Sequence, residues 1–306
     1  MRKTLLVGTA IIVALAPPAC SHPKDRVATP TIGNVAYAHT SPAQRLDLYL
    51  PTHADAPSPL VIHVHGGGFE SGDRRMEESR VRPLLEAGFA VASVDYRLSG
   101  EARFPAAGQD AKAAVRWLRA NAGRYHVDPD RFAAWGESAG GTLALLIGTT
   151  GDQRTIFDDP ALGNPMVSSA VQAVVDWYGP TDMLQEQAQA RSNRGHGCPA
   201  PADHDGPLTF ESRYFGAPIQ TIPRTVAEGN PITYVTTATR LPPFSITHGS
   251  ADCLVPPAQS QLLVDAVVHA GGTADLTVLE GVEHGDPRAD AKMVRPTVDW
   301  LERQLG

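Results

Sequence analysis

The stretch RFAAWGESAGGTLALLI at residues 131–147 decides the fold of this 306-residue chain. Its first part is apolar and predicts a strand, and its last part is rich in alanine and leucine and predicts a helix. The GESAGG motif between them predicts a sharp turn, because glycine accepts conformations and close contacts that other residues do not. A strand–turn–helix unit of this kind lifts a serine above the edge of a sheet, with a helix N-terminus beneath it that favours negative charge. Ser138 is therefore the candidate nucleophile.

A second glycine motif, HGGGF at 65–69, follows a continuous apolar strand. Glycines there allow backbone N–H groups to approach a bound carbonyl oxygen closely. We expect Gly67 and Gly68, with the N–H of Ala139, to form an oxyanion hole. A phosphate-binding loop is the alternative, but the sequence has no G-x-x-x-x-G-K-[ST] pattern. His65 is expected to shape the loop by hydrogen bonding.

The base and its acid are expected late in the chain, because strand–turn–helix nucleophiles of this type precede first the acid and then the histidine. His284 lies in the glycine-flanked segment GVEHG and is the predicted base. Asp252 follows the penultimate predicted strand and is the predicted acid. Asp182 follows an earlier strand and stays open as the alternative acid, its other role being to cap a turn. Glu137 is expected to pair with backbone or arginine groups and has no predicted catalytic part.

Strands and helices alternate along most of the chain, which predicts an α/β fold with a mostly parallel sheet and helices on both faces. The first strand alternates apolar and polar residues and is expected to be half-buried. The expected strands span residues 45–50, 60–64, 89–94, 131–135, 171–177, 243–247 and 274–279, and the expected helices span 77–87, 107–122, 139–147, 256–270 and 289–305.

Residues of about 180–240 depart from this alternation, being rich in proline, glycine and polar residues. We expect them to form a cap over the carboxyl edge of the sheet, where ligands of open α/β folds bind. The cap contains His196 and His204 but no motif that identifies a substrate.

Residues 1–20 are expected to be a signal peptide, since two basic residues precede a short apolar run at 5–16. This run is too short for a membrane-spanning helix, which needs about 20 apolar residues. The segment LAPPAC ends at Cys20 and resembles a lipoprotein site, so simple cleavage and lipid attachment both stay open. Residues 21–33 are expected to be a flexible leader, and 34–306 the catalytic domain.

The formal net charge is −7, with 26 basic and 33 acidic residues, and no basic cluster predicts a nucleic-acid partner. Apart from Cys20, the chain has Cys198 and Cys253. In an exported protein these two permit a disulfide, and two unpaired buried thiols are the alternative. No cysteine or histidine spacing predicts a metal.

In combination, these motifs resemble the α/β-hydrolase superfamily, in particular bacterial HGGG-type esterases and lipases that border on feruloyl-esterase-like and prolyl-oligopeptidase-like hydrolases. The similarity covers residues of about 46–305. The motifs that carry it are HGGGF at 65–69, VDYRL at 94–98, AVRWL at 114–118, DPDR at 128–131, GESAGG at 136–141, YGPTD at 178–182 and HGSADCLVPPAQS at 248–260.

The resemblance implies an eight-stranded sheet with a small cap insertion and no metal or organic cofactor. It implies a catalytic triad of Ser138, Asp252 and His284. In exported relatives a cysteine after the acid pairs with one in the cap, which corresponds here to Cys253 and Cys198.

We therefore expect an exported serine carboxylesterase, secreted or periplasmic, that hydrolyses short-chain acyl esters such as acetyl or feruloyl esters of polysaccharide. The expected partner is a small or polysaccharide-linked ester, with membrane contact only through a lipid at Cys20. A prolyl-oligopeptidase-like peptidase is one alternative, although a glycine-lined oxyanion hole is more typical of esterases. A non-catalytic binding protein on a hydrolase scaffold is the other, although all triad residue types are present.

Overall fold

The computed structural model describes residues 26–52, 55–194 and 198–306. The expected signal peptide and the lipid site at Cys20 lie outside the described residues. None of the helices in the described ranges has both the length and the apolar character that crossing a membrane requires.

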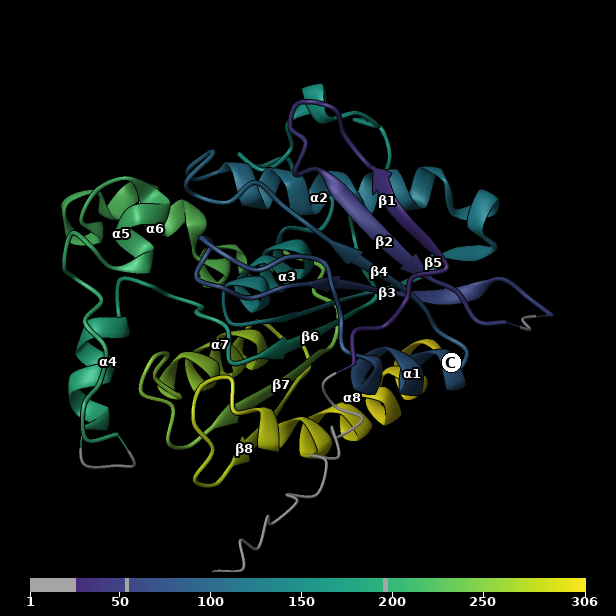
Figure 1. Cartoon of the computed structure of the whole chain (residues 1–306). Coiled ribbons are helices and arrows are strands. Elements are labelled where there is room, and N and C mark those ends of the chain that lie inside the picture. Colours follow the sequence, from purple (N-terminus) through teal and green to yellow (C-terminus); the bar gives the residue numbers. More distant parts are fainter. Residues whose placement is uncertain (1–25, 53–54, 195–197) are drawn as a thin grey trace, which may run out of the picture.

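Eight strands form one sheet in the order β1-β2-β4-β3-β5-β6-β7-β8 (Figure 1). The β1–β2 and β2–β4 pairs are antiparallel, and every pair from β4–β3 to β7–β8 is parallel. The mostly parallel sheet predicted from the sequence is thus confirmed. The strands are β1 (Ile32–Ala36), β2 (Arg45–Tyr49), β3 (Ser58–Val64), β4 (Ala90–Val94), β5 (Val127–Glu137), β6 (Ala173–Trp177), β7 (Phe244–Gly249) and β8 (Ala274–Leu279).

The parallel register brings the candidate residues to one edge of the sheet. Val64 at the end of β3 pairs with Gly136 near the end of β5, so the segments that follow both strands begin side by side. Asp252 and His284 follow β7 and β8, which pair with each other and end at the same edge. Segments far apart in the sequence therefore meet where the strands end.

Helices cover both faces of the sheet, as predicted. On one face α1 and α8 bury their apolar sides in a core cluster with the strands, and on the other α2, α3 and α7 pack into a larger cluster. Both clusters consist of apolar side chains with almost no exposure, so burial of this surface is the main force that holds the layers together. The helices are α1 (Glu78–Glu86), α2 (Ala106–Ala120), α3 (Ala139–Thr150), α7 (Ala258–His269) and α8 (Asp290–Leu305).

Two expectations about the N-terminal part need correction. β2 is buried on both faces, because Asp47 binds Arg74 and Tyr49 packs into the α1–α8 cluster. The expected 21–33 leader overlaps β1, and the N–H of Ala28 donates to the carbonyl of Met76 at 2.9 Å. From residue 26 onward, the described part of this leader therefore belongs to the folded domain.

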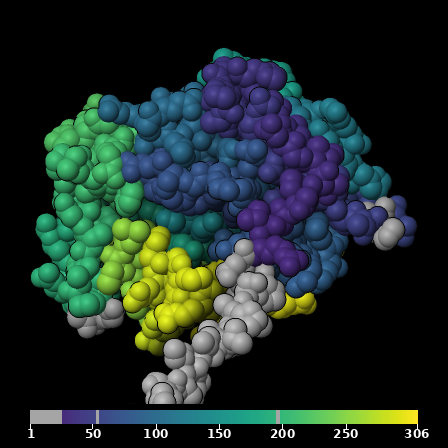
Figure 2. Space-filling view, in the orientation of Figure 1, coloured from purple at the N-terminus to yellow at the C-terminus, as the bar shows by residue number. Residues whose placement is uncertain are grey.

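The region expected to be a cap holds three short helices, α4 (Glu186–Asn193), α5 (Phe210–Phe215) and α6 (Pro223–Gly229). Figure 2 shows these segments, in green, along one side of the molecule, beside blue segments from the first third of the chain and yellow C-terminal ones. Cys198 and Cys253 form a disulfide with a sequence separation of 55. This bond, which the resemblance implied, ties the cap to the loop that carries Asp252.

Candidate active site

Ser138 lies on a strained turn between β5 and α3. Its φ of 53° and ψ of −124° fall in a region that non-glycine residues rarely adopt. The surrounding backbone holds this conformation: the Ser138 N–H donates to the carbonyl of Trp177 at 2.9 Å. A Cβ at Gly136 would lie 2.1 Å from the carbonyl oxygen of Gly140, so only glycine allows the chain to turn this tightly.

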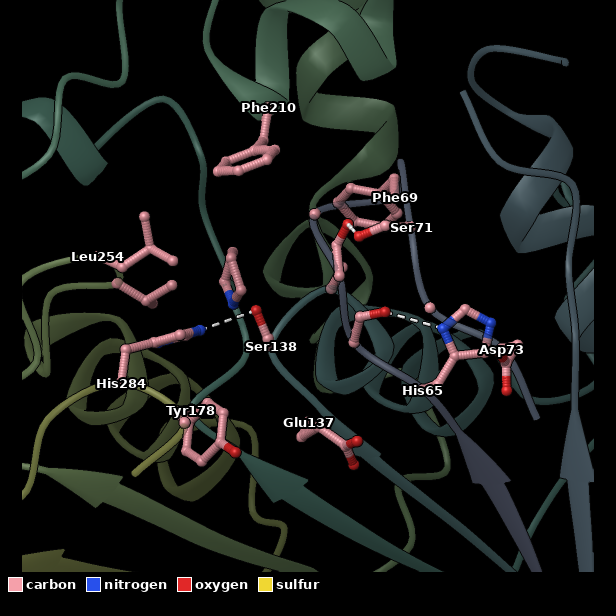
Figure 3. A pocket seen from close by; sticks show the side chains of 18 of the residues that line it. His65, Phe69, Ser71, Asp73, Glu137, Ser138, Tyr178, Phe210, Leu254 and His284 are labelled. Carbon is pink, nitrogen blue, oxygen red and sulfur yellow. Dashed lines mark hydrogen bonds between the residues drawn. The ribbon is translucent and has the colours of Figure 1, made fainter. Parts of the chain in front are cut away.

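His284 lies within hydrogen-bonding distance of both Ser138 and Asp252, so the three side chains run in the order nucleophile, base and acid. His284 Nε2 is 2.9 Å from Ser138 Oγ, and His284 Nδ1 is 2.7 Å from Asp252 Oδ2 (Figure 3 shows the first of these bonds). The N–H at Nδ1 donates a hydrogen bond to the carboxylate. Nε2 then carries no proton and can accept the hydroxyl proton of the serine. The structure thus brings together the three residues that the sequence analysis selected.

Asp252 is buried but remains ionised. Only 1% of the residue is exposed, and its Oδ1 accepts hydrogen bonds from the N–H groups of Leu254 and Val255, both at 2.8 Å. Burial by itself raises the pKa of Asp252, but hydrogen bonds from His248 and His284 outweigh it and hold the pKa far below its usual range. A permanent negative charge therefore faces the imidazole of His284.

His248 supports the acid in a way that the sequence analysis did not predict. Its Nε2 is 3.2 Å from Asp252 Oδ2 and 3.0 Å from the carbonyl oxygen of Val255, while its Nδ1 is 2.7 Å from Ser260 Oγ. The sequence analysis gave this histidine no part in the site. The sequence signal that could have linked His248 to the acid is its position at the end of β7, four residues before Asp252.

Asp182, the alternative acid, faces a different set of groups. It accepts hydrogen bonds from the N–H of Leu184 at 3.2 Å, from Gln185 Nε2 at 2.7 Å and from Asn230 Nδ2 at 2.7 Å. These contacts satisfy a turn at the start of the cap, which is the capping role considered for it. The carboxylate that His284 contacts is Asp252.

The HGGGF loop lines the cavity in front of Ser138. Gly67 has a φ of +110°, and a Cβ there would lie 2.2 Å from the carbonyl oxygen of Ser71. His65 holds the loop from behind, since its Nδ1 donates to the carbonyl of Gly66 at 2.8 Å (Figure 3) and its ring stacks on Tyr96. His65 thus shapes the loop, as expected.

The third expected donor comes from α3. Ala139 is the first residue of this helix, where N–H groups have no partner within the helix. Gly67, Gly68 and Ala139 all line the same cavity as Ser138. Three N–H groups near the nucleophile can stabilise negative charge on a carbonyl oxygen.

Glu137 fixes the floor of the site. Its carboxylate accepts from His63 Nε2 at 2.9 Å and lies 3.3 Å from Arg80 Nη1. Burial raises the pKa of Glu137, but the nearby His63 and Arg80 outweigh this effect and bring the pKa to about 2. The side chain lies below Ser138 (Figure 3) and ties β5 to β3 and α1, which agrees with the pairing role expected for it.

The cavity above Ser138 has a volume of about 550 Å³. One part of its wall is apolar, with Phe210 over the site and Leu254 beside His284 (Figure 3). Charged side chains from the segment after the HGGGF loop line another part, namely Asp73, Arg75 and Glu77. Among the described residues, the group of side chains with metal-binding geometry lies in the cap, and one of its members, Glu211, also lines this cavity.

The sheet, the strained serine turn and the chain order of serine, acid and histidine are those of the α/β-hydrolases. More specifically, residues 46–293 match the family model BD-FAE, and the chain belongs to this family of α/β-hydrolase esterases.

Known proteins that are similar to this chain are also named as esterases. Esterase LipC of Mycobacterium tuberculosis is 30% identical over 264 residues, covering 84% of this chain and 60% of LipC. Among solved structures, a truncated form of a carbohydrate esterase from gut microbiota has a TM-score of 0.79 at 31% identity, covering 89% of this chain and 95% of that one. A bifunctional GH43-CE protein of Bacteroides eggerthii has a TM-score of 0.78 at 30% identity, covering 90% of this chain and 35% of that one. This chain therefore spans about three fifths of the length of LipC.

Proposed function

We propose that this protein is an exported serine carboxylesterase that hydrolyses short acyl esters of carbohydrates. The observation that carries the proposal is the pair of hydrogen bonds of 2.9 Å and 2.7 Å that join Ser138, His284 and Asp252. Such a pair makes a serine hydroxyl nucleophilic, because the imidazole accepts its proton as the bond to the substrate forms.

In the proposed reaction, Ser138 Oγ attacks the ester carbonyl while His284 Nε2 takes its proton. The carbonyl oxygen becomes negatively charged and accepts hydrogen bonds from the N–H groups of Gly67, Gly68 and Ala139. His284 then protonates the leaving alcohol, and an acyl-enzyme remains. Water, deprotonated by His284, attacks the acyl-enzyme and releases the acid. Asp252 stays ionised throughout and stabilises the imidazolium.

The cavity supports an acyl group of modest size and a polar alcohol. Its apolar wall, which includes Phe210 and Leu254, suits an acetyl or hydroxycinnamoyl group, and the charged wall at Asp73, Arg75 and Glu77 suits the hydroxyl groups of a sugar. Two similar solved proteins are described as a carbohydrate esterase and a GH43-CE protein, which also favours a carbohydrate ester.

Export is supported by the pattern of residues 1–20 and by the disulfide between Cys198 and Cys253, since structural disulfides persist in oxidising compartments. Cell fractionation and the intact mass of the mature chain test this part. Incorporation of labelled palmitate that is lost in Cys20→Ser assigns a lipid anchor. A full-length chain that stays in the cytoplasm contradicts export.

Labelling with a fluorophosphonate tests the nucleophile. We expect peptide mass spectrometry to find the adduct on Ser138, with no adduct in Ser138→Ala. Ser71→Ala is the matched control, because Ser71 also lines the cavity, and it should still be labelled on Ser138. An unlabelled folded wild-type protein would favour the non-catalytic binding protein instead.

A substrate panel tests the reaction class. We expect hydrolysis of p-nitrophenyl acetate and release of acetate or ferulate from acylated xylo-oligosaccharides, with kcat/KM falling for octanoate and longer chains. A prolyl anilide is included in parallel. Cleavage of the anilide without cleavage of any ester would identify the protein as a peptidase and overturn the proposal.

A further inference from the structure

Three side chains of metal-binding type meet inside the cap, away from the catalytic hydrogen bonds. Glu186 is the first residue of α4, His204 lies in the segment after Cys198, and Glu211 is the second residue of α5. One ligand atom from each lies within 4.8 Å of the others. Glu186 is completely buried, and the exposed fractions of His204 and Glu211 are 1% and 8%.

The spacing of these atoms fits the coordination shell of a transition-metal ion. His204 Nδ1 is 3.0 Å from Glu211 Oε1 and 3.7 Å from Glu186 Oε2. Metal–nitrogen and metal–oxygen bonds of about 2.0–2.2 Å place neighbouring ligand atoms roughly 3.0–3.5 Å apart in octahedral or tetrahedral geometry. The two distances from His204 Nδ1 are therefore within a few tenths of an ångström of this spacing, and all three ligand atoms lie within 4.8 Å of one another.

The cluster is short of hydrogen-bond partners, which is the independent sign of a missing ligand. Within the described part of the chain, both carboxylate oxygens of Glu186, Oε2 of Glu211 and Nε2 of His204 are buried and have no partner. Leaving such groups unpaired costs about 1–3 kcal/mol each, and more for charged groups. Native proteins avoid this cost, so the completely buried and unpartnered carboxylate of Glu186, beside His204 and Glu211, indicates a bound group.

The negative charge around the cluster favours a cation of more than one positive charge. The charged groups that act most strongly on Glu186 are the carboxylates of Glu211, Asp182 and Asp252. A protonated His204 would neutralise only one of the two cluster carboxylates. A divalent ion neutralises both and accepts the lone pair of a neutral imidazole at the same time.

We propose that Glu186, His204 and Glu211 bind a divalent transition-metal ion, with zinc the preferred ion, inside the cap. One imidazole nitrogen and two carboxylates form a ligand set that suits zinc, whereas calcium and magnesium prefer oxygen ligands alone. These three ligands leave the fourth position of a tetrahedral zinc site open. His204 and Glu211 also line a cavity of about 510 Å³.

The ion ties together parts of the cap that border the substrate cavity. Glu211 lines that cavity, and Phe210, its neighbour on α5, lies over the site (Figure 3). The ring of Phe210 also meets the HGGGF loop, since a Cβ on Gly68 would lie 2.4 Å from it. Loss of the ion would therefore release the aromatic wall of the cavity while leaving Ser138 and His284 in place.

Metal analysis of the full chain, purified without a polyhistidine tag from zinc-supplemented medium, tests the proposal. We expect about one zinc per chain by mass spectrometry. Removal of zinc with a chelator should lower Tm by at least about 5 °C, and added zinc should restore it, because a ligand that binds only the folded state stabilises it. Glu186→Gln should weaken zinc binding at least about 100-fold, whereas Glu228→Gln, an exposed control on α6, should bind zinc like the wild type.

Wild-type protein with less than about 0.1 zinc per chain and no Tm response to added zinc overturns the proposal, whatever the variants do. In that case Glu186 and Glu211 share a proton, and Glu186→Gln is as stable as the wild type or more so. Metal content and Tm do not depend on esterase activity. A failure here is therefore distinct from a failure of the proposed reaction.

Discussion

Asp252→Asn tests the central arrangement of the site, because every lone-pair direction of this carboxylate is in use. Oδ1 accepts from the N–H groups of Leu254 and Val255, and Oδ2 faces the imidazoles of His284 and His248. An asparagine keeps its oxygen toward the two backbone donors and turns its NH2 group toward His284. Nδ1 must then accept a hydrogen bond, so the proton moves to Nε2.

A proton on Nε2 of His284 prevents the imidazole from accepting the proton of Ser138. The shape of the site is preserved, yet the base has the wrong tautomer. In serine hydrolases with the same arrangement, such a change lowers kcat by ~10⁴, which corresponds to about 5 kcal/mol of activation free energy. We expect a loss of this size in the kcat for p-nitrophenyl acetate, measured well below the Tm of the variant.

Asp182→Asn is the matched control, since Asp182 is the other candidate acid and contacts turn and cap groups instead. We expect its kcat to stay within about threefold of the wild type. If Asp252→Asn keeps more than about a tenth of the wild-type kcat, or if Asp182→Asn is the inactive variant, the assignment of the acid is wrong.

Gly67, the disulfide and Glu137 each allow a further test of the structure. Gly67→Ala should lower kcat about 100- to 1,000-fold through a displaced oxyanion donor, whereas Gly123→Ala, where an added Cβ meets no atom within 4 Å, should match the wild type in steady-state assays. Replacing both Cys198 and Cys253 with serine should lower the free energy of unfolding by about 4 kcal/mol and Tm by about 10 °C, because the disulfide closes a 55-residue loop. A melting curve that is unchanged in the variant, and unchanged in the wild type under reductant, would contradict this. The pKa of Glu137 is about 2 in the folded protein, against an ordinary value of 4.5. Its negative charge therefore stabilises the fold by about 3 kcal/mol above about pH 4.5, and this contribution is lost as the pH falls toward 2. Urea unfolding of Glu137→Gln should therefore depend less on pH over that range, and equal slopes for both proteins would refute the inference.

Most of the fold could be predicted from local patterns. Apolar runs such as 60–64 and the glycine motifs at their ends identified the parallel strands and the turns that carry the site. β1 (Ile32–Ala36) escaped prediction because it is a short edge strand without a strong apolar pattern. β2 (Arg45–Tyr49) was expected to be half-buried, and only the tertiary contacts of Asp47 and Tyr49 show that both of its faces are covered.

The sequence by itself determined the class of fold, the serine turn and the late histidine, because each depends on residues close together in the chain. It left Asp252 and Asp182 as rival acids, and it did not connect His248 with the acid. Only the tertiary structure decided these points, along with the meeting of Glu186, His204 and Glu211 across the cap. Contacts between distant segments depend on how strands align and loops pack, and no short stretch of sequence contains that information.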